Sequence, residues 1–206
     1  MIVAKKYLIK GVRELLRVYF RLRAKWWTLL LETQASLNNG RLNHDKTLKV
    51  HCPVRCDGRG MVSIGANVSL GYARAPRYGN GEILLQARKP TAKIEIGPDT
   101  VTSNNVVMVA NDSIRIGRNC LIGDLVSIID SDFHAIEAQE RKRSAGQVAA
   151  VSIGDNVWLG ARVMVMKGVS IGNNSVIAAG SVVTTTIPGD VVAGGVPAKI
   201  IRKIPG

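Results

Sequence analysis

The sequence contains few aromatic, cysteine or acidic residues. Phe, Trp and Tyr together make up 4% of the 206 residues, and 15 acidic residues stand against 28 Lys and Arg, which gives a formal net charge of +13. With so few rings, the chain suits a narrow core filled by aliphatic side chains, and its length allows one domain with a sizeable core. The basic excess points to an anionic partner.

Cysteine spacing and the first residues argue against two further classes of protein. The three cysteines are Cys52 and Cys56 in CPVRC, and Cys120, which replaces an aliphatic residue in a repeat. Their spacing lacks the second cysteine pair or the histidine pair of a zinc site. The first ten residues, MIVAKKYLIK, lack the apolar core and the small-residue cleavage site of a secretory signal. We therefore expect a reduced, cytoplasmic protein.

The most regular feature of the chain is an aliphatic residue at every sixth position near the C-terminus. These anchors are Ile153, Leu159, Val165, Ile171, Ile177 and Val183. Small or branched residues lie two positions before them, at Val151, Val157, Val163, Val169, Ser175 and Ser181. The same period recurs upstream at Ile64, Leu70, Ile116, Ile122 and Ile128. A period of six fits neither a helix nor a simple pleat, so it predicts a β-helix with three short sides per coil and one inward anchor per side.

Glycine follows many of these anchors, as at Gly65, Gly117 and Gly160. Glycine adopts positive φ without a steric penalty, so we expect a tight corner with positive φ at each of these positions.

Residues 1–40 precede the β-helix and differ from it in composition. Eight cations lie in residues 1–37, against Glu14 and Glu32: Lys5, Lys6, Lys10, Arg13, Arg17, Arg21, Arg23 and Lys25. Apolar residues recur among them at intervals of three and four: Leu8, Val12, Leu15, Leu16, Tyr19, Leu22, Trp26, Leu29 and Leu30. This pattern predicts a basic amphipathic helix that ends near Asn38, Asn39 and Gly40.

Two interpretations of this helix stay open. It can cover an open end or side of the β-helix, or pack against a neighbouring subunit. Alternatively, it can lie in a membrane interface, with Trp26 and Trp27 at headgroup depth and its cations on anionic lipid. Charges interrupt the segment too often for it to span a bilayer. No recognised nucleic-acid-binding module accompanies the charge, so we expect no nucleic-acid partner.

The repeat fails where counting in sixes onward from Ile128 reaches His134. A buried histidine with unpaired nitrogens would cost ~1 to 3 kcal/mol, so we expect the chain to leave the β-helix here. The next anchor is Ile153, and residues 135–150 (AIEAQERKRSAGQVAA) are therefore predicted to form a functional loop excursion from the domain that spans residues 41–206.

His134 lies beside carboxylates, in DSDFHAIE. Histidine suits proton transfer near neutral pH, and a neighbouring carboxylate can fix its tautomer and raise its basicity. We predict that His134 is a catalytic base oriented by Asp132 or Asp130. A zinc hydrolase on this scaffold would need three converging histidines, but the repeats contain His134 alone, so no metal is expected. We expect no role for His44 or His51, which precede the first clear repeat.

Residues 151–204, VSIGDNVWLGARVMVMKGVSIGNNSVIAAGSVVTTTIPGDVVAGGVPAKIIRKI, resemble the hexapeptide-repeat O-acetyltransferases. This family includes galactoside, maltose and xenobiotic acetyltransferases and those of bacterial capsules, colanic acid and O-antigens. The DSDFHAI form and the stretch GNGEILLQARKP, residues 79–90, are more similar to the polysaccharide branch. The resemblance implies an all-β fold, a left-handed parallel β-helix of hexapeptide repeats, here with an N-terminal α-helical extension. It also implies a homotrimer with acetyl-CoA bound between subunits.

The resemblance also assigns individual residues. His134 matches the catalytic histidine of the family, and Asn104 and Asn105 lie near its acceptor-binding asparagine. Arg141, in the excursion, is a candidate contact for an anionic acceptor. The positions that match cofactor contacts are Trp158 in NVWLG, Gly160, Ala161, Ala179, Thr184, Thr185, Lys199 and Arg202. The family commonly has Thr-Lys where Thr184 and Thr185 lie, so one cation is missing here.

These observations predict an acetyl-CoA-dependent O-acetyltransferase that acts on a sugar hydroxyl. The acceptor implied is a bacterial surface polysaccharide or its lipid-linked or nucleotide-linked precursor. A main-chain N–H near Gly160 is expected to stabilise the oxyanion. The alternative from the same scaffold is an N-acetyltransferase of a nucleotide-linked amino sugar. A β-helical scaffold without catalysis and a basic nucleic-acid binder are the rivals from other classes.

Overall fold

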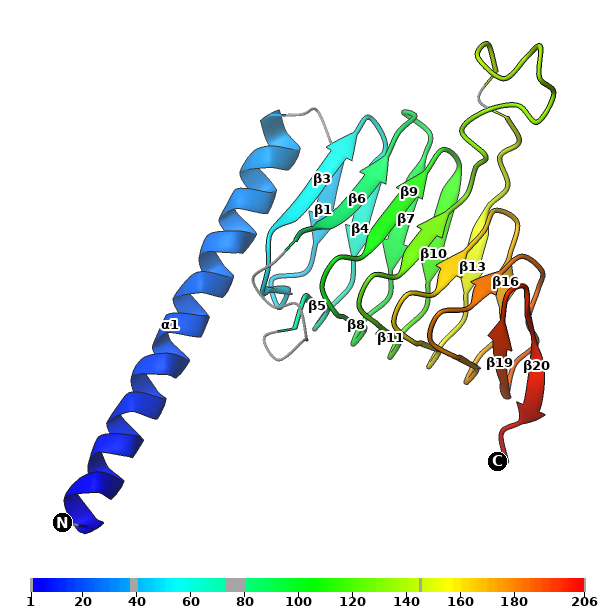
Figure 1. The fold of residues 1–206 in the computed structure, drawn as a ribbon. Helices are drawn as coiled ribbons and strands as arrows, with labels where there is room; N and C mark the ends of the chain where they lie inside the picture. Colours follow the sequence, from blue (N-terminus) through cyan, green and yellow to red (C-terminus); the bar gives the residue numbers. More distant parts are fainter. Residues whose placement is uncertain (1, 38–40, 73–80, 145, 206) are drawn as a thin grey trace.

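The computed structural model describes residues 2–37, 41–72, 81–144 and 146–205, and for residues 2–11, 13, 16 and 17 it describes the backbone alone. One long helix, α1 (Ile2–Leu37), is followed by a parallel β-helix of short strands (Figure 1). The helix continues to the residue before Asn38, Asn39 and Gly40, where its end was predicted; these three lie outside the described residues.

Three sheets form the three walls of the β-helix. The strands of the first wall are β1 (Arg41–His44), β4 (Met61–Ile64), β7 (Lys93–Ile96), β10 (Ser113–Ile116), β13 (Val151–Ile153) and β16 (Ser170–Ile171). Those of the second wall are β2 (Lys49–Val50), β5 (Ser69–Leu70), β8 (Val101–Thr102), β11 (Leu121–Ile122), β14 (Trp158–Leu159), β17 (Val176–Ile177), β19 (Val191–Gly195) and β20 (Ala198–Lys203). Those of the third wall are β3 (Val54–Gly58), β6 (Ile83–Ala87), β9 (Val107–Ala110), β12 (Ser127–Ile129), β15 (Met164–Val165) and β18 (Val182–Val183).

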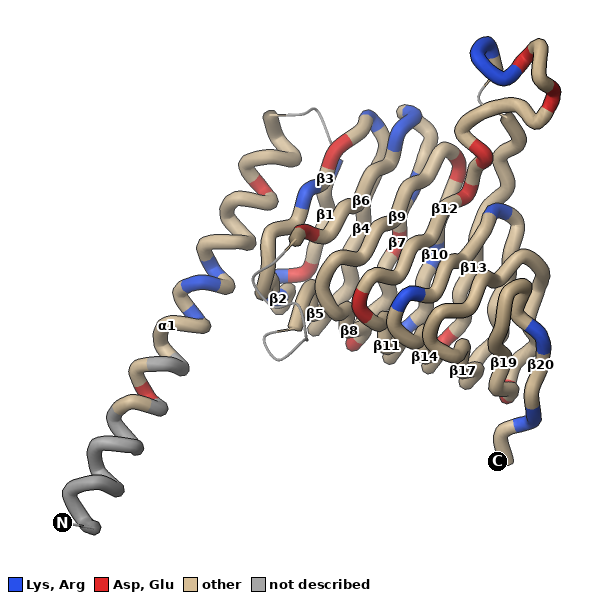
Figure 2. The backbone as a smooth tube through the Cα atoms, in the orientation of Figure 1, with Lys and Arg blue, Asp and Glu red and all other residues tan. Residues whose placement is uncertain are grey.

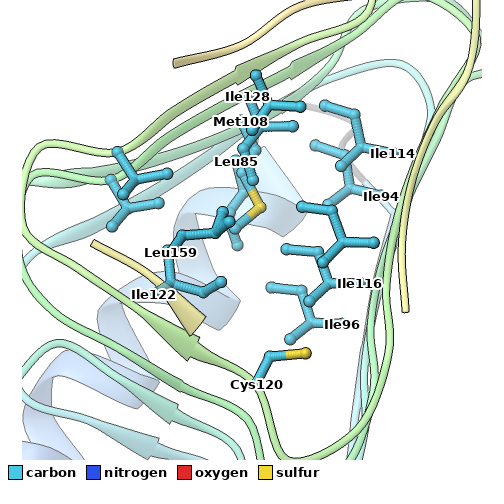
Figure 3. Close-up of a cluster of buried hydrophobic side chains, with 14 of the residues drawn as sticks. Leu85, Ile94, Ile96, Met108, Ile114, Ile116, Cys120, Ile122, Ile128 and Leu159 are labelled. Carbon is cyan, nitrogen blue, oxygen red and sulfur yellow. The ribbon is translucent and has the colours of Figure 1, made fainter. Parts of the chain in front are cut away.

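The predicted anchors fill the interior of these walls. Ile96 pairs with Ile116 (Figure 3). Ile116 in turn pairs with Ile153, so one aliphatic column runs through successive coils. Each of these three side chains is buried. Because complete burial of such a side chain stabilises the fold by about 1.5 to 3 kcal/mol, the columns are a major source of stability. The six-residue period was therefore interpreted correctly.

The reason given for glycine after the anchors holds at Gly71, which follows Leu70 and has a φ of 82°, but it was wrong at the other corners. Gly117 and Gly160 do not have positive φ; within these corners it occurs two residues later, as at Asn119 (56°) and Arg162 (61°). A Cβ atom on Gly117 would lie 2.6 Å from the carbonyl of Gly154 in the next coil. Glycine is required because the stacked corners approach too closely for a side chain.

Helix α1 covers the open end of the β-helix with its C-terminal half, and its N-terminal half extends past the first coil (Figure 1). Leu31 and Ala35 are buried, and Trp27 packs against the core rather than facing a membrane. A contact between Nε2 of His44 and Oε1 of Glu32, 2.8 Å apart, joins the helix to β1. The interpretation that the helix covers an open end of the β-helix therefore applies only to its C-terminal half.

Two segments interrupt the coils on the described chain. One connects β12 to β13 and protrudes from the molecule (Figure 1). It starts earlier than the predicted residues 135–150, because Ser131 already forms an antiparallel bridge with Val148. The other connects β5 to β6, residues 71–82, of which residues 73–80 lie outside the described part. The sequence signal for the second was the missing anchor between Leu70 and Ile83.

Candidate functional site

His134 lies at the root of the excursion between β12 and β13. The two chains of this root are held together by Asp132 N–H donating to Gln147 O (3.0 Å) and Ala135 N–H donating to Ser144 O (3.2 Å). The imidazole is exposed, and its Nδ1 lies 2.9 Å from the main-chain oxygen of Arg141. A carbonyl oxygen can only accept, so Nδ1 carries a hydrogen, and in the neutral ring this leaves the lone pair on Nε2. The ring is thus prepared to accept a proton at Nε2.

Arg141 folds the excursion back on itself. Its Nη2 donates to the main-chain oxygen of Ile136, at 2.8 Å. Its carbonyl holds His134, so this residue shapes the loop through both its side chain and its main chain. The guanidinium that was predicted to meet an anionic acceptor is therefore engaged within the loop.

Asp130 does not orient His134. Its carboxylate is fully buried and accepts the N–H of Asn111 at 2.8 and 3.0 Å and the N–H of Asp112 at 2.7 Å. Both donors belong to the turn between β9 and β10, in the coil before the excursion. Asp130 thus fastens one coil to the next, because a carboxylate satisfies two main-chain donors that would otherwise be buried unpaired.

Asp132 also forms no hydrogen bond with the imidazole among the described residues. Its Oδ1 forms an ion pair with Nζ of Lys167, at 2.9 Å. Its Oδ2 is shielded from solvent and has no hydrogen-bond partner among the described residues. The expected contact between a carboxylate and His134 is therefore replaced by the carbonyl of Arg141, because the excursion turns back over the ring.

Phe133 and Arg88 are two neighbours of the site that sequence reasoning missed. Phe133 precedes His134 and has a φ of 65°, which is uncommon for a residue other than glycine. The Arg88 guanidinium carbon lies 4.5 Å from the centre of its ring. Arg88 follows β6, so no local pattern in the sequence pointed to this contact.

The residues matched to cofactor contacts lie mainly on the second wall. Trp158, on β14, is 52% exposed and lines a groove of about 290 Å³ together with Tyr72 and Leu121. Lys199 and Arg202 are exposed on β20, whose partner strand β19 belongs to the same wall. An apolar groove and two cations therefore lie on one wall.

The corners beside this wall hold the remaining matched positions. Ala161 and Ala179 are exposed in successive coils, after β14 and β17. Thr184 and Thr185 are exposed after β18, at the end of the third wall. The N–H of Gly160 donates to Ile177 O at 2.8 Å, so coil stacking occupies the oxyanion donor expected at this residue.

One chain does not bring His134 and Trp158 together. His134 belongs to the excursion that leaves between the third and first walls, whereas Trp158 lies on the second wall. Figure 1 shows the excursion on the side of the β-helix opposite to β5, β8 and β11 of that wall. A site that uses both residues therefore requires two copies of the chain.

Asn104 and Asn105 hold the ends of the segment between β5 and β6. The Asn104 amide is 1% exposed, and its Oδ1 accepts the N–H of Tyr72 at 3.0 Å. Nδ2 of Asn105 donates to Oδ1 of Asp124 at 3.1 Å, and a Cβ atom on Gly81 would collide with its side chain. Asn104 is thus bonded to the main chain of Tyr72, and the acceptor contact at Asn104 or Asn105 stays a prediction.

The described residues contain no group of three or more His, Cys, Asp or Glu side chains that could hold a metal ion. The cysteines Cys52, Cys56 and Cys120 are free and buried. Burial raises the pKa of the Cys52 and Cys56 thiols to about 11, so both are protonated at neutral pH. The described helix contains no stretch that is long and apolar enough to cross a membrane.

Comparison with known proteins gives a consistent match. Residues 150–185 match the family model described as bacterial transferase hexapeptide (six repeats). The chain is 33% identical over 168 residues to a protein of Escherichia coli K12 named as lipopolysaccharide biosynthesis O-acetyl transferase WbbJ, covering 77% of this chain and 79% of that protein. It is 40% identical over 113 residues to the galactoside O-acetyltransferase of the same organism, covering 55% of each.

Solved structures agree with this match. The polySia-specific acetyltransferase NeuO superposes with a TM-score of 0.63 at 30% identity, over 80% of this chain and 67% of that one. A galactoside acetyltransferase in complex with coenzyme A gives a TM-score of 0.53 at 40% identity, over 54% of this chain and 56% of that one. The chain spans little more than half the length of the first curated relatives that it matches. The expected fold class, a left-handed parallel β-helix with an N-terminal helix, is confirmed.

Proposed function

This chain belongs to the hexapeptide-repeat acetyltransferase family, and on that premise we propose that it transfers an acetyl group from acetyl-CoA to a sugar hydroxyl. The observation that carries the proposal is the orientation of His134. Its Nδ1 is held by the Arg141 carbonyl, and its Nε2 is left as an exposed base at the root of the excursion. A base in this state is what the activation of a hydroxyl requires.

The reaction follows from this tautomer. Nε2 of His134 removes the proton from the acceptor hydroxyl as its oxygen attacks the thioester carbonyl of acetyl-CoA. The carbon–sulfur bond then breaks, and the departing thiolate takes the proton from the imidazolium, which yields the acetyl ester, coenzyme A and neutral His134. His134 alone carries the proton in this reaction, and no covalent intermediate forms on the protein.

The site lies between subunits of a homotrimer in this proposal. His134 and Trp158 are on different walls of one chain, so His134 of one copy would face Trp158 of another. Trp158, Ala161, Ala179, Lys199 and Arg202 would then line the acetyl-CoA site, with the cations near its phosphates. The coenzyme A complex of the galactoside acetyltransferase supports this donor.

The acceptor that we propose is a bacterial surface polysaccharide, or its lipid-linked or nucleotide-linked precursor. WbbJ is named for lipopolysaccharide biosynthesis and NeuO for polysialic acid, and the chain aligns with both over more than three quarters of its length. We also propose a cytoplasmic location with peripheral contact of residues 1–37 at an anionic membrane, because eight cations lie there against two acidic residues.

Thiol release from acetyl-CoA tests the proposal, in a screen of nucleotide sugars and surface-glycan fragments. General-base help is worth ~10² to 10⁴-fold, so His134→Ala should lower turnover by that factor, roughly 3 to 5 kcal/mol of barrier, and leave acetyl-CoA affinity unchanged. His44→Ala is the matched control, since that ring is bonded to α1. Equal turnover in His134→Ala would remove this residue from the chemistry.

The product distinguishes the two acetyltransferase candidates. An ester formed on a hydroxyl is released by mild alkali, whereas the amide formed by an N-acetyltransferase of an amino sugar is stable. A product that is stable to alkali would therefore show that the acceptor group is an amine rather than a hydroxyl. The role of His134 as the base would not change.

A further inference from the structure

Helix α1 presents an apolar stripe that nothing in the described chain covers. Its members recur at intervals of three and four: Val12, Leu15, Tyr19, Leu22, Trp26 and Leu29. Leu15 and Leu22 are 71% and 62% exposed, whereas Leu31 is buried against the first coil. At about 100° per residue, the stripe lies on the face of α1 opposite to Leu31. Most of the stripe therefore faces away from the β-helix.

One edge of the stripe continues into a groove of about 910 Å³ between α1 and the chain around β2. Leu22 and Leu29 of the stripe line this groove. Four exposed cations line it too: Arg21, Lys25, Lys46 and Lys49. Figure 2 shows basic residues in the middle of α1 near β2. The carboxylate in the lining, Glu32, is bonded to His44.

This arrangement suits a ligand with an apolar part and an anionic part. We propose that the stripe enters an anionic phospholipid bilayer and that the groove binds a lipid phosphate. The inference rests on the peripheral membrane contact proposed above. It adds which face of α1 enters the bilayer, where a lipid phosphate binds and how the protein is oriented on the membrane. Pairing with a second α1 through the stripe would bring eight cations of one helix near eight of another, which like charges oppose.

Sedimentation with lipid vesicles tests this surface. Vesicles of phosphatidylglycerol and phosphatidylcholine should bind the full chain, and pure phosphatidylcholine should bind it weakly. Each cation near such a surface contributes about fivefold, so Lys46→Gln with Lys49→Gln should weaken binding about 25-fold. Leu22→Ser with Leu29→Ser should also weaken it, and Ile201→Ser, at an exposed position on β20, should leave it unchanged.

Thiol release with a short soluble acceptor should be the same in all these variants, which separates this proposal from the catalytic one. Unchanged vesicle binding in both double variants would overturn the inference. A change of oligomeric state in the leucine variant, without loss of vesicle binding, would instead assign the stripe to a second copy of the chain.

A second inference concerns Arg88, which stacks on Phe133 beside the proposed base. Nε of Arg88 donates to Oε1 of Gln86, and Nε2 of Gln86 donates to Oδ1 of Asp57, each at 2.7 Å. This chain of bonds runs along the third wall and fixes the guanidinium over the ring of Phe133. The excursion is thereby attached to the rigid coils before it.

We infer that Arg88 is a positioning residue for His134. Phe133 holds a φ of 65°, which persists in a residue of this type only where its surroundings enforce it. Because His134 is the next residue, the backbone of Phe133 sets the direction in which the imidazole leaves the root. The inference rests on the proposed base.

Kinetics of Arg88 variants test this role. Arg88→Met should lower kcat about tenfold with the KM for acetyl-CoA unchanged, since loss of orientation affects the transition state alone. Arg88→Lys should restore part of kcat, because an ammonium also binds the face of a ring. Lys89→Met is the control, an exposed cation at the next position.

A kcat unchanged in Arg88→Met, or a rise confined to the KM of the acceptor, would overturn the positioning role. If His134→Ala retains activity, the proposed base itself fails. If His134→Ala is inactive and Arg88→Met is not impaired, the role of Arg88 alone fails.

Discussion

Replacing Asp130 tests whether its carboxylate has a structural or a catalytic role. This side chain is fully buried and accepts two main-chain donors, the N–H groups of Asn111 and Asp112, at 2.7 to 3.0 Å. Hydrogen bonds to a charged group contribute about 1.5 to 3 kcal/mol each, so Asp130→Ala should lower the free energy of unfolding by roughly 3 to 6 kcal/mol. Asp130→Asn keeps one acceptor oxygen and should lose about half of that.

Urea denaturation followed by far-UV circular dichroism measures this loss, and thiol release below the unfolding transition measures turnover. We expect Asp130→Asn to be destabilised with an unchanged kcat, because the carboxylate does not touch His134. Glu137→Gln, in the exposed excursion, is the matched control and should change neither quantity. Full stability with a ~100-fold loss of kcat in Asp130→Asn would refute the structural role and return this carboxylate to the proton relay.

Three further changes test other parts of the structure. Gly117→Ala would place a Cβ atom 2.6 Å from the next coil and should cost about 1 to 3 kcal/mol, seen as a lower Tm in calorimetry; an unchanged Tm would contradict the stacking explanation. The Cys52 and Cys56 thiols ionise near pH 9.0 when unfolded and at about pH 11 when buried, so the free energy of unfolding should fall between these values by up to roughly 2 to 3 kcal/mol per thiol. The midpoint of urea denaturation should lose this pH dependence in the double variant Cys52→Ala with Cys56→Ala. A pH dependence that persists in this variant would contradict the assignment to these thiols. Lys167→Met leaves the Asp132 carboxylate without its ion-pair partner and should lower the free energy of unfolding by about 1 to 3 kcal/mol. In a double-mutant cycle, Lys167→Met should cost less when Asp132 is already Asn, and an equal cost in both backgrounds would contradict the ion pair.

The glycines and carboxylates show how far the pattern of the sequence reaches. Glycine after an anchor marked each corner correctly, but its cause at corners other than Gly71 is the approach of the next coil rather than a positive φ at that residue. Asp130 and Asp132 were correctly placed near the break in the repeat. Their partners, Asn111 and Lys167, lie in neighbouring coils, and a local count along the chain cannot identify them.

The sequence by itself determined the coil, its buried columns, the end of α1 close to Asn38 and the presence of an excursion near His134, although the chain already leaves the coil around Ser131. These features repeat along the chain with a fixed period, so side-chain polarity at each position is enough to reveal burial. Tertiary structure alone decided that the Arg141 carbonyl orients the imidazole, that Arg88 lies over Phe133, and that α1 leaves one apolar face uncovered. Each of these depends on how an excursion or a helix folds back onto coils distant in sequence, and no period in the chain sets those distances.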